Sequence, residues 1–138
     1  MKLEDLSDRD RHFLEELKAT DFGPIAYKLM NPEDGQGLTL EETTHGIEEY
    51  RKFLILQYFY RDRGIVPTRE MDKVWHVHIL DTVKYREDCD RLFGEMLDHF
   101  PYLGLRGESD RQLLQQTFRE SQVLFEETFG SSREAVAV

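Results

Sequence analysis

The sequence predicts an all-α protein, a compact single-domain bundle of five or six helices. Helical periodicity dominates, and no stretch alternates for long in the pattern of a strand. The chain has 138 residues, which suits one domain and suffices to bury a core without disulfides or a structural metal ion. We therefore expect one domain over residues 1–138, with a core at about 22–130 and a frayed tail at 131–138.

The N-terminal part of the chain predicts two short helices. Ser7 is a suitable N-cap for the first, and acidic residues follow in its first turn, where the helix dipole favours them. The apolar side of this helix comprises Phe13, Leu14 and Leu17. The segment 22–31 predicts a second helix with Pro24 near its start. The Asn, Pro and Gly residues of 31–37 then indicate a loop.

Thr39 opens the longest predicted helix, because Glu42 follows three residues later in the pattern of a capping box. This helix is expected to run to about Arg63 and to end at Gly64. Its second half, 53–60, is apolar nearly all round, so we expect it to be the central helix of the bundle.

The C-terminal half predicts three more helices and one long loop. Thr68 caps the next helix, and Asp81 caps the one that follows it. The apolar stripe of that following helix comprises Tyr85, Cys89, Leu92, Phe93 and Met96. The loop at 98–108 is apolar enough that we expect it to be ordered against the core. Ser109 caps the last helix, which ends at Gly130. Its inward residues are predicted to be Leu114, Phe118, Ser121 and Phe125.

Charge and composition exclude several classes of function. The net charge is −10, with 28 acidic residues against 18 basic ones, which argues against nucleic-acid binding because phosphate backbones are repelled. The longest apolar run, 53–60, is far shorter than a membrane helix, and the first 20 residues contain no signal-peptide core. A single cysteine fits a reducing cytosol. We therefore expect a cytoplasmic protein whose partner is a protein or a small molecule.

The stretch "VWHVHILDTVKY" at 74–85 holds two histidines beside the only tryptophan. On a regular helix His76 and His78 lie about 160° apart around the axis, so they cannot bind one ion together. His78 lies in the middle of an apolar arc, whereas His76 shares a side with Asp72 at i, i+4. The pattern is therefore a weaker metal signal than H-E-x-x-H.

A metal site is nevertheless predicted if residues distant in sequence converge. Its candidate ligands are His76, His99, Asp72 and His78, with Glu49, Asp88 and Cys89 in reserve. Three or four nitrogen and oxygen ligands suit a divalent transition metal, zinc or iron above all, with manganese and copper also compatible. Glu42 and His45 form one E-x-x-H pattern, but a ferritin-like site needs two, and the second is absent.

The alternative interpretation of these residues is structural. Histidines on an apolar stripe are usually core residues with satisfied nitrogens, and a cysteine on such a stripe usually packs as a small apolar residue. Packing roles are also expected for Tyr50, Trp75 and Tyr85, and surface positions for His12 and His45. No nucleophile elbow, P-loop or dinucleotide motif is present in the sequence.

Three functions therefore stay open. The first is a metal-binding domain, as a metal-dependent enzyme of unknown reaction. The second is a non-catalytic protein–protein interaction module with structurally buried histidines. The third is a metal-free acid/base enzyme that uses a His/Asp pair.

Several segments resemble the glycine-rich-domain-containing-protein-like family, a domain of unknown function, in its bacterial single-domain form. They are "GPIAYKLM", "EEYRKFL", "IVPTREMDKVWHVHILDTVKYREDCDRLFG" and "LDHFPYLGLRGESD". The likeness covers about Phe22 to Gly130, and plant relatives carry the same W-H-x-H core in longer chains. The resemblance implies no reaction or cofactor.

The family motif focuses interest on a set of positions in this chain: Asp72, Trp75, His76, His78, Asp81, Tyr85, Asp88, Cys89 and His99. Many bacterial members of the family have His-His where this chain has Asp98-His99. The resemblance therefore implies that position 98 is not an indispensable nitrogen ligand. The glycine-rich segment of the family name is missing, so the chain corresponds to the bare helical domain.

Overall fold

The structure, a computed structural model, describes residues 5–130, so the predicted frayed tail at 131–138 lies outside the described residues. Six helices and no strand occur within residues 5–130, which confirms the all-α prediction. The helices are α1 Asp8–Ala19, α2 Gly23–Met30, α3 Leu40–Phe59, α4 Arg69–Leu80, α5 Thr82–Phe93 and α6 Glu108–Phe129. None of these helices is long and apolar enough to cross a membrane.

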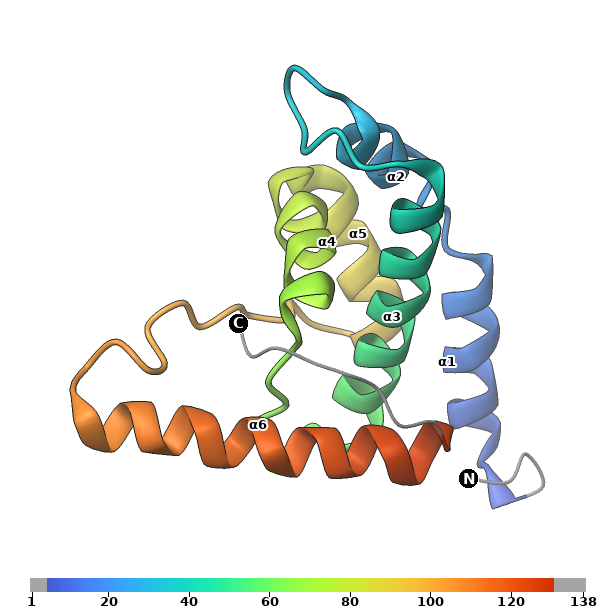
Figure 1. Cartoon of the computed structure of the whole chain (residues 1–138). Coiled ribbons are helices and arrows are strands. Elements are labelled where there is room, and N and C mark those ends of the chain that lie inside the picture. Colours follow the sequence, from blue (N-terminus) through green and yellow to red (C-terminus); the bar gives the residue numbers. More distant parts are fainter. Residues whose placement is uncertain (1–4, 131–138) are drawn as a thin grey trace.

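Helix α3 occupies the centre of the fold, as its apolar second half predicts (Figure 1). It packs against α2, α4 and α6, and its Tyr50, Phe53 and Leu56 are completely buried. Phe13 and Leu17 of α1 belong to the same hydrophobic cluster as these residues of α3. The core therefore includes α1, which lies before the predicted core range of about 22–130.

Three of the predicted helix starts are confirmed. The side chains of Ser7, Thr39 and Thr68 accept hydrogen bonds from backbone N–H groups in the first turns of α1, α3 and α4. Thr39 and Glu42 form the complete capping box, since the Glu42 carboxylate also accepts from the Thr39 N–H at 2.9 Å. Local hydrogen bonding in the first turn thus fixes where these helices begin.

Asp81 is the N-cap residue of α5, as predicted, and its carbonyl oxygen accepts from the Tyr85 N–H, but its side chain makes no capping hydrogen bond. Two other predicted boundaries are wrong. Ser109 lies inside α6, whose N-cap is Gly107 at φ 110°, a conformation that favours glycine. Helix α3 ends at Phe59 and not near Gly64, and the turn that follows leads to the buried Ile65 and Val66.

The predictions for the end of α5 and the next loop are wrong in part. Gly94, at φ 74°, ends α5 one residue after Phe93, so Met96 is outside the helix and exposed. The loop is not packed on the core along its length, because Phe100, Tyr102 and Leu105 are exposed. The Asp110 carboxylate instead holds the loop through the Gly104 N–H at 2.7 Å.

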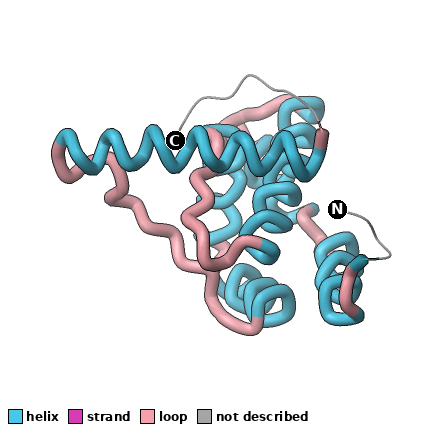
Figure 2. The backbone as a smooth tube through the Cα atoms, turned by 90° about the horizontal axis from the view of Figure 1, so that it is seen from below, coloured by secondary structure: helices cyan, strands magenta, loops and turns pink. Residues whose placement is uncertain are grey.

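Helix α6 crosses the end of α3, and its N-terminal half extends past the other helices (Figures 1 and 2). Its C-terminal half carries the core contacts: Ser121, Leu124 and Phe125 are buried, and Ser121 Oγ accepts from the Val66 N–H at 2.9 Å. The predicted inward residues Leu114 and Phe118 are only half-buried. The loop before α6 reaches out to the projecting end, so the two form one wing beside α4.

We predict that Thr39→Ala lowers the free energy of unfolding by about 1 kcal/mol, the usual effect of losing a side-chain N-cap. Ser109→Ala serves as the control, because Ser109 is not the cap of α6. Urea titration followed by circular dichroism measures both variants. A larger loss in Ser109→Ala than in Thr39→Ala would contradict the observed helix starts.

Candidate metal centre

Helix α4 presents two of the predicted ligands on one face. Asp72 and His76 are four residues apart, so they lie one above the other along the helix. The opposite face of α4 is buried through Met71, Val74 and His78. Burial of that face fixes the rotation of α4 and directs the Asp72–His76 face toward the loop that follows α5.

His99 completes the group from that loop. The ring of Trp75 lies 4.4 Å from the His99 ring between centroids. The indole N–H of Trp75 donates to the Tyr85 hydroxyl at 2.9 Å, and Tyr85 donates to the carbonyl oxygen of Leu97. Trp75 and Tyr85, predicted as packing residues, are buried and also hold the chain two residues before His99.

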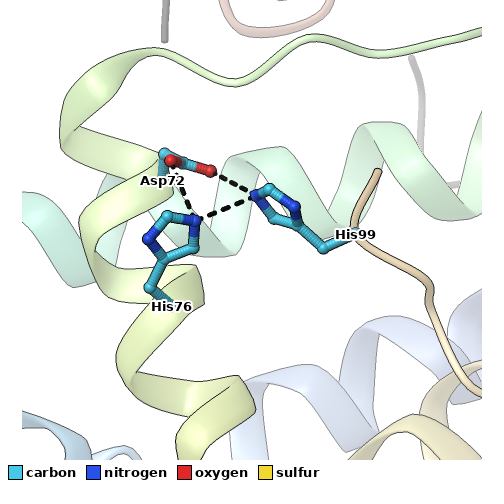
Figure 3. Close-up of side chains that lie close together, drawn as sticks. All are labelled: Asp72, His76 and His99. Atoms are coloured by element: carbon cyan, nitrogen blue, oxygen red, sulfur yellow. Dashed lines mark hydrogen bonds and ion pairs between the residues drawn. The ribbon is translucent and has the colours of Figure 1, made fainter. Parts of the chain in front are cut away.

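Three side-chain groups thereby converge at one point (Figure 3). The Nε2 atoms of His76 and His99 are 3.0 Å apart. His99 Nε2 lies 2.9 Å from Asp72 Oδ1, and His76 Nε2 lies 3.1 Å from Asp72 Oδ2. Donor atoms in a tetrahedral zinc site, at about 2.0–2.1 Å from the ion, lie about 3.3 Å from one another. The triangle is therefore close to the size that a bound ion requires.

Hydrogen bonds alone leave an unfavourable contact in this triangle when both imidazoles are neutral. If each Nε2 carries a proton toward Asp72, both protons have a carboxylate acceptor, but the two N–H groups lie 3.0 Å apart and repel each other. If one Nε2 is unprotonated, its lone pair faces a carboxylate oxygen instead. A single cation in the middle is favourable for all three groups at once.

The cluster adjoins a pocket, which Asp72 and His99 line and His76 does not. The side chain of Asp72 is 9% exposed, that of His99 is 18% exposed and that of His76 is 53% exposed. This pocket of about 400 Å³ is also lined by Trp75. An ion held by the cluster would therefore adjoin both solvent and a partly apolar cavity.

His78, the fourth predicted ligand, lies apart from this cluster in the core. Its Nδ1 is 2.8 Å from the Tyr50 hydroxyl, and its Nε2 is 2.8 Å from Asp88 Oδ2. Burial lowers the pKa of the His78 imidazole, although the contact with Asp88 raises it. Both ring nitrogens are engaged, as the structural interpretation of His78 expects.

The reserve residues Asp88 and Cys89 are engaged elsewhere. Burial raises the pKa of the Asp88 carboxyl, but hydrogen bonds with His78, Arg91 and Lys84 outweigh it and the pKa is lowered. Cys89 is buried, and burial raises the pKa of its thiol. Neither side chain belongs to the Asp72–His76–His99 cluster.

The third reserve residue, Glu49, belongs to a second cluster with His45 and Glu70. His45 Nδ1 lies 2.6 Å from Glu70, whereas its Nε2 lies 3.9 Å from Glu49. Opposite nitrogens of one ring cannot bind the same ion, and Lys52 Nζ also lies 3.5 Å from Glu49. The cluster is therefore an ion-pair link between α3 and α4. Glu42 of the E-x-x-H pattern is used in the cap of α3.

The structure thus defines an all-α domain with a two-histidine, one-carboxylate cluster beside a pocket. The family profile described as UCP032817-like matches residues 15–124, and the chain belongs to this family. It is similar to two proteins of Arabidopsis thaliana, glycine-rich domain-containing proteins 1 and 2. The first is 30% identical over 112 residues, covering 78% of this chain and 13% of the relative. The second is 29% identical over 111 residues, covering 78% and 14%.

The chain therefore spans about a seventh of the length of these curated relatives. The match confirms the family to which the sequence shows a resemblance. No solved structure matches the chain.

We predict opposite pH dependences for two histidine substitutions. The hydrogen bond with Glu70 raises the pKa of His45 in the folded protein. This pair therefore contributes its full stabilisation below the unfolded-state pKa near 6.5, and the stabilisation is lost as pH rises through the raised pKa of the folded state. His78 has a lowered pKa, so wild type loses stability as pH falls below 6.5, where the unfolded chain takes up a proton first.

His45→Gln should therefore destabilise the protein more at pH 5.5 than at pH 8, and His78→Gln should do so less at pH 5.5. At pH 8 the loss for His78→Gln should be about 1–3 kcal/mol, as for other buried hydrogen-bonded groups. Urea titrations at the two pH values measure both differences. A greater loss of stability for His78→Gln at pH 5.5 than at pH 8 would show that Asp88 raises the pKa of His78 more than burial lowers it.

Proposed function

We propose that the chain binds one divalent transition-metal ion, zinc or iron, through Asp72, His76 and His99. The observation that carries the proposal is the convergence of two Nε2 atoms and one carboxylate within 3.1 Å of one another, in a triangle where hydrogen bonds alone leave an unfavourable contact. Nitrogen and carboxylate donors of this kind suit both metals.

We further propose that the ion serves a reaction on a small molecule. A closed structural zinc site has four protein ligands, whereas this cluster offers three and so leaves an open coordination position. Such an ion supplies a Lewis acid next to the pocket. The buried carboxylate of Asp72 holds both imidazoles in orientation, and Trp75 limits the access of water to one side of His99.

We predict that added zinc raises the melting temperature of the tag-free, chelator-treated protein. Stabilisation by linkage is about 2.7 kcal/mol when free metal exceeds Kd a hundredfold. His76→Ala, His99→Ala and Asp72→Asn should each abolish the shift and the metal found by elemental analysis. His45→Ala is the matched control, since it removes a histidine from the other cluster and should keep the full shift relative to its own baseline.

The proposal fails if purified protein contains no metal and if zinc, iron(II), manganese and copper leave the melting temperature unchanged. A non-catalytic interaction module would then be the leading function. Its first test would be substitution of the exposed apolar side chains of the wing, Phe100, Tyr102 and Leu105.

A further inference from the structure

The pocket beside the candidate metal centre is lined by segments distant in sequence. They are the end of α3 at Gln57, the approach to α4 with its first turns, the loop after α5 and the N-terminal half of α6. The side chains are mostly apolar, among them Val66, Trp75, Phe100, Leu103, Leu105 and Leu114. At about 400 Å³, the volume is in the range of pockets that hold small organic molecules.

The charged groups of the pocket determine which charge a bound ligand should carry. Asp72 and Asp98 carry negative charge and Arg63 carries positive charge. A divalent ion at the Asp72–His76–His99 cluster turns this balance positive, because both imidazoles bind metal in the neutral form. Arg63 lies over the ring of Tyr60, and no ion pair of Arg63 with a carboxylate is found within residues 5–130. The metal-loaded pocket therefore favours an anionic group and the metal-free pocket does not.

We infer that the pocket binds a small, largely apolar organic acid whose anionic oxygen donor faces the metal and whose body lies against the leucines of the loop and α6. This inference rests on the proposed metal site and names the class of molecule on which that site acts. The position of Asp72 and His99 on the pocket wall brings the donor group to the ion. The apolar lining supplies affinity through burial of the ligand's body.

Two hydroxamates with the same chelating group test the inference on the zinc-loaded protein of residues 1–138. Benzohydroxamate carries an apolar ring, and acetohydroxamate carries only a methyl group. Isothermal titration calorimetry gives both affinities, and Trp75, the only tryptophan, reports occupancy of the pocket by fluorescence. We expect benzohydroxamate to bind the protein at least about tenfold more tightly than acetohydroxamate, after correction for the ratio of their affinities for free zinc. A few apolar carbons in a pocket contribute a factor of this size.

Adjacent leucines of α6 provide a matched pair of variants. Leu114 lines the pocket, whereas Leu113 is exposed and does not. Leu114→Asn should weaken benzohydroxamate binding about tenfold and leave acetohydroxamate and zinc unchanged. Leu113→Asn should change none of the three affinities. Arg63→Gln, on an exposed residue, should weaken both hydroxamates without changing zinc affinity.

The outcomes separate the two proposals. If wild type binds no zinc, the metal site itself is wrong. If wild type binds zinc but shows no preference for benzohydroxamate beyond that of free zinc, the metal site stands and the ligand class is overturned. Equal effects of Leu113→Asn and Leu114→Asn would likewise overturn it.

Discussion

The indole of Trp75 joins the hydrophobic core to the candidate metal centre, and the geometry of the site depends on it. The indole packs against Phe53 of α3, with ring centroids 4.8 Å apart. It also contacts His99, and its N–H donates to Tyr85, which in turn donates to the carbonyl oxygen of Leu97. A residue that is 4% exposed thus connects the core to His99, the proposed ligand in the loop. Such support would keep the proposed ligands in place without the ion.

The two faces of α4 then have different consequences for their histidines. His78 points into the core, where Tyr50 and Asp88 satisfy both its nitrogens. His76 points to the surface, where it meets His99 and Asp72 in contacts that hydrogen bonds alone leave partly unfavourable. The same residue type two positions apart is structural in one case and a proposed ligand in the other, because the helix turns them to opposite sides.

Local patterns in the sequence predicted what depends on neighbours along the chain. The capping box at Thr39 and the i, i+4 pairing of Asp72 with His76 are of this kind. The return of His99 to α4 was also predicted, as one of the candidate ligands that could converge with Asp72 and His76. The failures concern choices between nearby alternatives: Gly107 takes the cap position that Ser109 was expected to hold, and α5 ends before Met96.

Apart from the return of His99, features that need contacts between distant segments could not be predicted. The pocket brings Arg63 near a loop and a helix that lie more than 30 residues away, and no local pattern reports this. The His45–Glu70 link joins α3 and α4 across 25 residues, and His45 was expected only to be on the surface. The wing is a further example, since the apolar loop predicted burial, whereas its Phe100 and Tyr102 remain exposed.

The most direct test of the central claim is a crystal structure of the protein grown with zinc, with anomalous data collected at the zinc edge. We expect a single strong peak about 2.0–2.1 Å from Nε2 of both His76 and His99, and at a similar distance from an oxygen of Asp72. A map with no peak at this position, or with a peak only between His45 and Glu70, would contradict it.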